Sequence, residues 1–490
     1  MTQVIPAQEG RLVGLARKAW SSGTLMTWAS LMIRMGGLAV LLPLVLTRLP
    51  AAEVLVWQLL STITMLISWT DFGFSPTFAR IIAFARGGGG LHDLRAAMPG
   101  KVALPAIEHS GPLRMGAVLA TQRTVYLRLI GVAMLLAVVA GTAALAKPVA
   151  GLAHAPDGWI AWVITIASSQ LVLLNGANVS VLTGFDRIAT TRRLEAMIGA
   201  LQIGSASIVT LADGGLVAII ACYSFWQLAL YVLNRRNVTR LGVKASADDG
   251  FDREIFATIW PAAWRSGVGI LMSTGIIQAS GLVYAQVATA GDAAAYLLAL
   301  RLMTTVSQIS QAPFYSKLPT MARLRGERKI AEIVPVAARG MALALGAFVV
   351  GAVGVTIAAP ILLKLIGSNV HFPGFAMSAL LALAFFVERY GAMHVQIYSL
   401  TNHIIWHVIN GVTGVLMVLL FFVLWPLIGP LAMPAAMLGA YLGFCSWYAR
   451  SLSVKSLETH GWAMDRRTAL LPGLALILTL AIYWAWLSFG

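Results

Sequence analysis

Long apolar stretches follow one another along the chain, and they constrain its fold more than any other feature. A helix needs roughly 20 apolar residues to cross the hydrocarbon core of a bilayer, and on that basis we predict thirteen crossing segments. They cover residues 20–47, 53–84, 124–147, 158–183, 194–212, 215–234, 256–287, 292–318, 337–365, 374–400, 403–425, 429–449 and 468–488. Lipid offers the backbone no hydrogen bonds, so spanning segments are helices or closed barrels. The stretches lack the polar–apolar alternation of a barrel strand, so the sequence predicts an all-α polytopic membrane protein.

The composition fits the same environment. Hydrophobic residues make up 59% of the chain and charged residues 11%, against about 25% charged residues in an ordinary soluble domain. The net charge of +16 comes from Lys and Arg between the apolar stretches. That distribution is typical of topology signals, so we expect no nucleic-acid partner. Cys222 and Cys445 lie inside apolar stretches without metal-ligand spacing, and we expect no metal site and no disulfide.

The charges of the loops predict the orientation. Arg- and Lys-rich segments, such as 187–193 and 323–329, follow the second, fourth, sixth, eighth and twelfth stretches, whereas the odd-numbered stretches lead into loops with few positive charges. Positive loops stay in the cytoplasm, so the N-terminus is predicted to be cytoplasmic. Residues 1–19 contain the basic stretch RLVGLARKA, which is typical of an amphipathic helix on the membrane surface.

One short sequence occurs twice. SPTFAR closes the second apolar stretch and LPTMAR closes the eighth; a weaker pair, VSVLTGFDR and QIYSLTNHI, closes the fourth and the tenth. These matches predict that stretches one to six repeat as seven to twelve in one orientation. The expected organisation is an N-terminal segment (1–19), a six-helix lobe (20–236) with a cytoplasmic loop (86–122), a linker (237–255), a second six-helix lobe (256–450), and a loop with an extra helix (451–490).

Ionisable residues inside apolar stretches are the candidate functional residues, because each costs roughly 2.5–3.5 kcal/mol at the bilayer centre. The cations are Arg34, Arg265, Arg301 and Arg389, and the groups suited to ion coupling or ion pairing are Asp71, Glu388 and His394. Arg80 and Arg323 close the two repeated motifs, as a cytoplasmic gate or as anchors that snorkel to the interface.

Three of these assignments have structural alternatives. Asp71 could be the partner of a nearby Arg, and His394 could be a packed polar group. Glu388 and Arg389 are adjacent on a predicted helix. Their side chains then point about 100° apart, so one of the two could pair with another helix.

The segment EVLVWQLLSTITMLISWTDFGFSPTFARIIA, followed later by WPAAWRSGVGILMS and YLLALRLMTTVSQISQAPFYSKLPTMARL, resembles a known family. It is similar to the polysaccharide transporters, or O-antigen (Wzx-type) flippases, of the multidrug/oligosaccharidyl-lipid/polysaccharide exporter (MOP) superfamily. Asp71, Gly73, Phe74 and Arg80 carry the motif, with Glu53 in the preceding outer turn. The loop at 86–122 is longer than the short connection expected in the family.

The apolar stretches and the repeated motifs predict twelve core transmembrane helices in two six-helix repeats, and residues 468–488 add a thirteenth. The resemblance implies that these helices form a MATE-like V-shaped bundle. It implies a flippase of the bacterial inner membrane that moves a polyprenyl-pyrophosphate-linked oligosaccharide to the outer leaflet by alternating access, for lipopolysaccharide or other cell-surface polysaccharide biosynthesis. No cofactor is implied. The implied partners are the lipid-linked glycan, membrane lipids, a polysaccharide polymerase and a chain-length regulator.

The balance of intramembrane charges favours an anionic substrate. Arg34, Arg265 and Arg301 outnumber the central carboxylates, and Arg matches phosphate oxygens with paired, charge-assisted hydrogen bonds. We expect these residues, with Arg389, to bind the head group in a cavity between the lobes. A cation-coupled small-molecule exporter is the alternative, and it would be expected to have an acidic cavity.

Catalytic functions are disfavoured. Asp248 and Asp249 form an adjacent acid pair without metal-ligand companions, and the chain contains no G-x-x-x-x-G-K-[ST] nucleotide-binding loop. A membrane glycosyltransferase or polymerase would need a catalytic constellation on a larger loop. We therefore expect that the protein is not an enzyme and has no catalytic residues.

Overall fold

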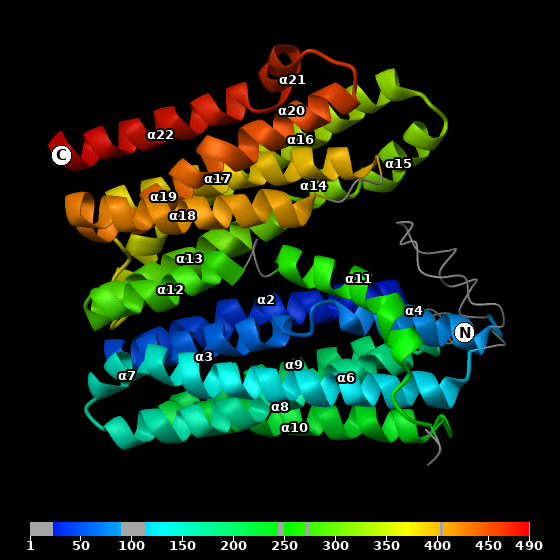
Figure 1. The fold of residues 1–490 in the computed structure, drawn as a ribbon. Coiled ribbons are helices and arrows are strands. Elements are labelled where there is room, and N and C mark those ends of the chain that lie inside the picture. Colours follow the sequence, from blue (N-terminus) through cyan, green and yellow to red (C-terminus); the bar gives the residue numbers. More distant parts are fainter. Residues whose placement is uncertain (1–22, 90–112, 244–248, 271–274, 402–404, 490) are drawn as a thin grey trace, which may run out of the picture. The chain divides into compact units, whose positions relative to one another are not determined.

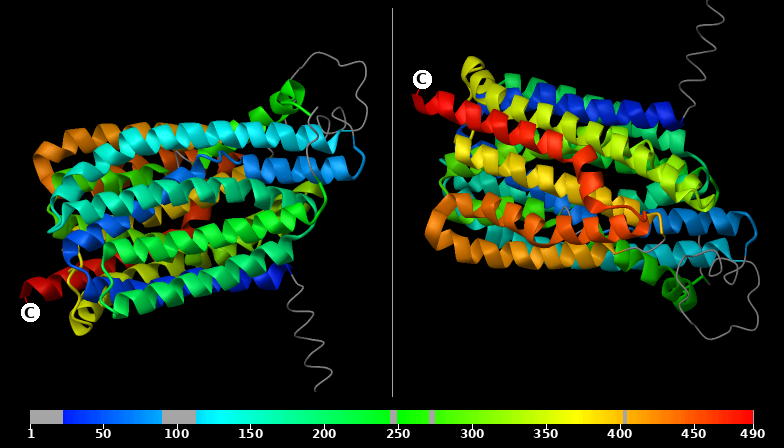
Figure 2. Two further views of the ribbon diagram at one scale, coloured as in Figure 1. Left: turned by 90° about the horizontal axis from the view of Figure 1, so that it is seen from below. Right: turned by 90° about the horizontal axis from the view of Figure 1, so that it is seen from above.

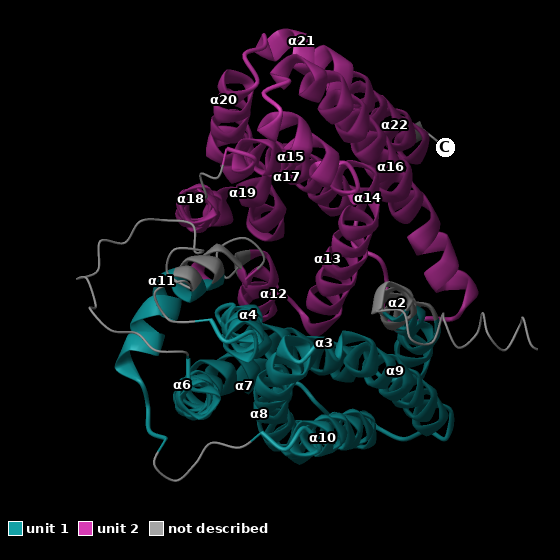
Figure 3. Ribbon diagram, turned by 90° about the vertical axis from the view of Figure 1, so that its right-hand side faces the viewer, with its two compact units in different colours: residues 1–267 teal, residues 268–490 magenta. Residues whose placement is uncertain are grey.

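In a computed structural model, the residues described are 23–89, 113–243, 249–270, 275–401 and 405–489 (Figure 1). These parts of the chain contain helices and no strand, which confirms the all-α prediction. They form two compact units, Met1–Gly267 and Val268–Gly490 (Figure 3). The amphipathic segment predicted at 1–19 lies outside the described residues.

Most helices of unit 1 run alongside one another (Figure 2). The helices of this unit are α2 (Gly23–Arg48), α3 (Ala51–Trp69), α4 (Phe74–Arg86), α6 (Met115–Leu136), the π-helical segment η1 (Ala137–Gly141), α7 (Thr142–Ala150), α8 (Ala155–Gly184), α9 (Ile188–Leu211), α10 (Leu216–Thr239) and α11 (Arg253–Ile270), whose last residues enter unit 2. A buried core joins α4, α6, α8 and α11 through Phe78, Val118, Leu182 and Ile259.

Unit 2 holds the remaining helices. They are α12 (Ile276–Val287), α13 (Ala290–Ser310), α14 (Ala312–Tyr315), α15 (Leu318–Gly326), α16 (Ile330–Leu365), α17 (Phe375–Ser399), α18 (Trp406–Ile428), the 3₁₀ turn η3 (Gly429–Leu431), α19 (Ala432–Ala440), the π-helical segment η4 (Tyr441–Cys445), α20 (Ser446–Ser456), α21 (Gly461–Thr468) and α22 (Leu470–Phe489). Tyr296, Phe314 and Phe348 are fully buried and anchor the packing of α13, α14 and α16.

Within the described residues, the thirteen predicted segments lie on helices over most of their length, and the differences from the prediction include the following. The second segment, predicted as continuous, is broken between α3 and α4, because Phe72 (φ 47°) and Gly73 (φ 74°) take the left-handed conformation that a helix cannot continue. The eighth segment, also predicted as continuous, is divided among α13, α14 and the start of α15. The loop predicted at 86–122 is shorter, because α6 already begins at Met115: its apolar start (MGAVLA) continues the helix beyond the predicted span.

The two copies of the repeated motif each lie on a short helix. SPTFAR belongs to α4 and LPTMAR to α15, and each is a short helix after a break in a long one. Phe78 and Met321, which share a position in the motif, are both fully buried. Among the described residues, nine helical segments are long and apolar enough to cross a membrane. The full count of twelve core spans and a thirteenth, and the repeat itself, remain predictions.

Candidate functional site

Consecutive polar residues of α17 face different neighbours in unit 2. Arg389 is almost fully buried, with 9% of its side chain exposed. Its Nε donates to Ser307 Oγ at 3.1 Å, its Nη1 to Gln311 Oε1 at 2.6 Å, and its Nη2 to Glu388 Oε2 at 3.1 Å. Arg389 therefore ties α17 to the end of α13 and neutralises Glu388. Adjacent residues on a helix point apart, but the long Arg side chain folds back to its neighbour.

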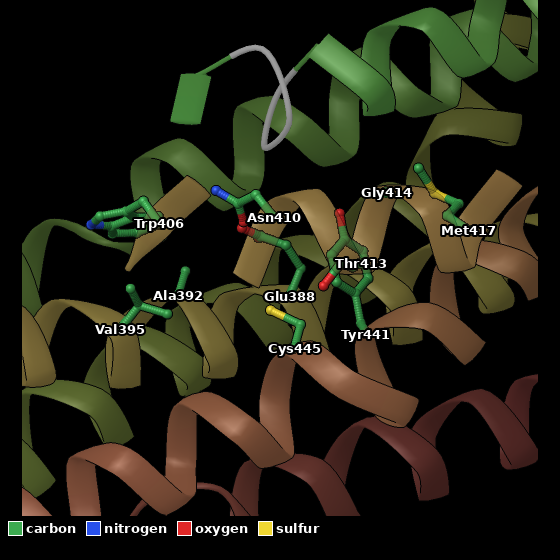
Figure 4. A pocket seen from close by; sticks show the side chains of 10 residues that line it. All are labelled: Glu388, Ala392, Val395, Trp406, Asn410, Thr413, Gly414, Met417, Tyr441 and Cys445. Carbon is green, nitrogen blue, oxygen red and sulfur yellow. The ribbon is translucent and has the colours of Figure 1, made fainter. Parts of the chain in front are cut away.

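Glu388 lines a small cavity inside unit 2 (Figure 4). The wall is formed by α17, α18 and η4, with the residues Glu388, Ala392, Val395, Trp406, Asn410, Thr413, Gly414, Met417, Tyr441 and Cys445. Figure 4 shows the Glu388 side chain extending toward Asn410, with Thr413, Tyr441 and Cys445 around it. The cavity measures about 30 Å³, and a water needs roughly 10–15 Å³ on this measure. The Glu388 cavity therefore has room for waters or a small ion and none for a sugar or a drug.

The π-helical segment η4 shapes this cavity. Tyr441 and Cys445, its first and last residues, both face the cavity. A π turn leaves backbone carbonyls without their usual helical partners, and such turns are frequent at functional sites. Here the buried Ser446 hydroxyl donates to the Tyr441 carbonyl at 2.8 Å. On the other side, Gly391 lets α17 approach closely: an added Cβ would lie 3.1 Å from Cys445 Sγ and 3.3 Å from Ser446 Cα.

His394 lies outside the wall of the Glu388 cavity and faces α20. Its imidazole is fully buried, its Nδ1 is hydrogen-bonded with Ser453 Oγ, and its ring packs edge-on against Tyr390 with the centroids 4.5 Å apart. Nε2 is buried without a hydrogen-bond partner in the described part of the chain. This setting fits a packed polar group, the alternative that the sequence left open.

Asp71 lies in unit 1, in the break between α3 and α4. Its Oδ1 accepts a hydrogen bond from the Tyr126 hydroxyl of α6 at 2.6 Å, and its Oδ2 accepts from the Ser75 backbone N–H at 3.0 Å. The Ser75 hydroxyl donates to the Gly176 carbonyl of α8 at 3.3 Å. None of the described Arg side chains forms an ion pair with Asp71. Asp71 therefore caps α4 and ties it to α6.

The other candidate arginines differ in their exposure and in their partners. Arg301 is half-buried on α13. Arg80 is exposed on α4, and Arg323 is exposed on α15, where it pairs with Glu327 at 2.7 Å. The side chains of Arg34 (α2) and Arg265 (α11) lie outside the described side chains. The structure brings together Glu388 and Arg389 in unit 2, and Asp71 belongs to unit 1.

The uncharged residues around Glu388 and Arg389, and those around Asp71, were not predicted from the sequence. Asn410 and Thr413 complete the Glu388 cavity. Ser307 and Gln311 accept hydrogen bonds from Arg389, and Tyr126 donates one to Asp71. A signal existed for Asn410 and Thr413, because an amide and a hydroxyl in the apolar run WHVINGVTG are unusual enough to mark a polar interior.

Known structures share this arrangement of helices over nearly the whole chain. The sequence matches no protein-family model and no curated protein. An inward-facing multidrug resistance MATE family transporter of the MOP superfamily aligns with a TM-score of 0.62 at 13% identity, covering 89% of this chain and 96% of that one. The lipid II flippase MurJ, in an inward closed conformation, aligns with a TM-score of 0.60 at 11% identity, covering 95% and 99%. The chain therefore has the all-helical fold of MOP-superfamily transporters.

Proposed function

We propose that this protein is a flippase that moves a polyprenyl-pyrophosphate-linked oligosaccharide across the bacterial inner membrane by alternating access. The observation that carries the proposal is the fold, which covers 95% of this chain and 99% of a lipid II flippase. Folds host many functions, so the substrate must be argued from the side chains.

The substrate class is proposed from the cations of the apolar helices. Arg34, Arg265 and Arg301 lie in α2, α11 and α13, and we assign them to the phosphate groups of the lipid carrier, whose oxygens accept paired hydrogen bonds from guanidinium. Arg389, which the sequence placed in this set, already donates to three side chains of unit 2. We propose that its contribution to substrate binding is indirect, through the position of α13.

Energy coupling is proposed at two partly buried carboxylates. Asp71 accepts hydrogen bonds from a phenol and a backbone amide. Glu388 faces a cavity large enough for waters or a small ion. Ionisable side chains within membrane-spanning helices commonly mark ion pathways and proton relays. Exchange of Glu388→Gln is expected to remove any dependence of transport on an ion gradient without abolishing head-group binding.

A cation-coupled exporter of small molecules is the second candidate. It is favoured by the likeness to a multidrug resistance transporter, whose TM-score of 0.62 is similar to that of the flippase at 0.60. This candidate predicts movement of cationic compounds, whereas the flippase predicts movement of an anionic lipid.

Arg301→Ala tests the proposal in cells whose only copy of the gene carries the change, with the amount of protein monitored. Loss of glycan export at normal protein level is expected. A matched control is Arg240→Ala, because Arg240 is an exposed cation at the end of α10. Normal export in the Arg301 variant, or equal loss in the control, contradicts the assignment.

A further inference from the structure

The short helix α21 (Gly461–Thr468) joins two candidate membrane spans. It lies between two segments that are apolar and long enough for membrane spans, Trp406–Ser456 and Leu470–Ser488. A helix between two spans lies at the membrane–water interface. Figure 3 shows α21 at the edge of unit 2, beside α20.

The two faces of α21 differ in character. Met464 and Thr468 are buried against unit 2, with 1% and 0% of their surface exposed. Trp462 is 65% exposed, and Arg466 and Arg467 are both exposed. Trp462 and Arg466 are four residues apart and share a helix face. The outer surface of α21 therefore combines one large aromatic ring with two guanidinium groups.

The single acidic residue of α21, Asp465, is hydrogen-bonded through both of its carboxylate oxygens. Asp465 Oδ1 accepts from the Tyr390 hydroxyl at 2.5 Å, and Oδ2 accepts from Arg450 Nε at 2.8 Å and pairs with its Nη2 at 2.6 Å. Asp465 therefore does not neutralise the positive charges of Arg466 and Arg467 on the same helix. The end of α20 adds the exposed Lys455, and the turn before α21 adds the exposed Glu458 and His460, so the formal charge around α21 stays positive.

We propose that α21 is a binding element for anionic phospholipids. Trp462 would enter the head-group region, where Trp side chains are enriched, and Arg466 and Arg467 would bind the lipid phosphates with charge-assisted hydrogen bonds. A lipid is the occupant that this position selects, because the two flanking spans hold α21 at the surface of the bilayer itself.

Lipid binding at α21 would also affect the proposed coupling site at Glu388. Asp465 joins α21 to Tyr390 of α17, and Tyr390 directly follows Glu388 and Arg389. An anionic lipid that holds α21 at the interface therefore supports the position of the helix that carries the Glu388 cavity. The proposal for α21 depends only on the fold of unit 2 and not on the proposed substrate.

Hydrogen exchange tests this proposal on the full-length protein. The peptide covering residues 457–469 is followed in nanodiscs of phosphatidylcholine with rising fractions of phosphatidylglycerol. Exchange is expected to slow as phosphatidylglycerol rises. In Arg466→Gln/Arg467→Gln, affinity for the lipid should fall roughly thirtyfold for the two charges, and the lipid-dependent protection should disappear.

The control is Arg235→Gln/Arg236→Gln, which removes an equally exposed pair of adjacent arginines from the end of α10. It should keep the protection of residues 457–469. Equal protection in pure phosphatidylcholine, or protection that survives in the Arg466/Arg467 variant, overturns the proposal. Protection produced by inorganic phosphate in phosphatidylcholine nanodiscs also overturns it, since the site would then recognise the free anion.

Discussion

Replacing Arg389 with Gln separates a structural role of this residue from a direct role in substrate binding. The side chain is 9% exposed and Glu388 is 20% exposed. The change removes the cation that neutralises Glu388 and the donors that serve Ser307 and Gln311. It leaves a carboxylate in a nearly closed site with no compensating charge from Arg389.

The expected cost follows from this geometry. Breaking a buried ion pair by removing one partner costs about 3–5 kcal/mol. The lower end applies here, because Glu388 still reaches a cavity with room for water. For a unit of this size, about 3 kcal/mol corresponds to a drop of roughly 6–12 °C in the unfolding midpoint. Glu388→Gln/Arg389→Gln should recover part of the loss, because neither charge is then left in the interior.

Cys445 provides the assay, since it is buried at the Glu388 cavity with 5% of its surface exposed. In a Cys222→Ala background, a thiol-reactive dye reports the unfolding of unit 2 in detergent as temperature rises. A lowered midpoint for Arg389→Gln and a partly restored one for the paired variant are expected. An unchanged midpoint together with lost transport would contradict a structural role of Arg389 and make it a direct ligand of the substrate.

Three further changes test individual contacts by the same thermal assay or by its equivalent for unit 1. Tyr126→Phe removes the hydroxyl that donates to Asp71 at 2.6 Å and should lower stability by about 1.5–3 kcal/mol; no loss would show that the bond is unimportant. Gly391→Ala should cost about 1–3 kcal/mol by overpacking against η4, whereas Gly354→Ala on α16, where an added Cβ meets nothing within 4 Å, should be neutral or stabilising; equal effects would contradict the close approach. Asp186→Gly should stabilise by roughly 1 kcal/mol, because this exposed residue holds a φ of 60°; a destabilised variant would show that the side chain has another role.

The sequence predicted the helices well because hydropathy alone identifies a span in lipid. It also found both copies of the repeated motif, and the structure places each in a short helix after a break. The breaks themselves were missed. Asp71, Phe72 and Gly73 sit inside an apolar run, and hydropathy does not record the left-handed backbone at Phe72 and Gly73.

The polar clusters were predicted only in part, for a related reason. Charged residues such as Glu388 and Arg389 stand out in apolar helices, so they could be named. Their partners could not, because Ser307 and Gln311 lie at the end of a helix far away in the sequence. The π turn at Tyr441–Cys445 leaves no mark in the residue pattern, although it decides which side chains enter the Glu388 cavity.

The proposed transport of an anionic, lipid-linked glycan can be measured with purified protein in proteoliposomes. A labelled polyprenyl-pyrophosphate oligosaccharide is followed as it moves between the two leaflets. We expect faster movement than in protein-free vesicles, slowed by Arg301→Ala, and no accelerated movement of cationic drugs. Transport of cationic drugs driven by an ion gradient, with the glycan lipid left in its original leaflet, would contradict the proposal.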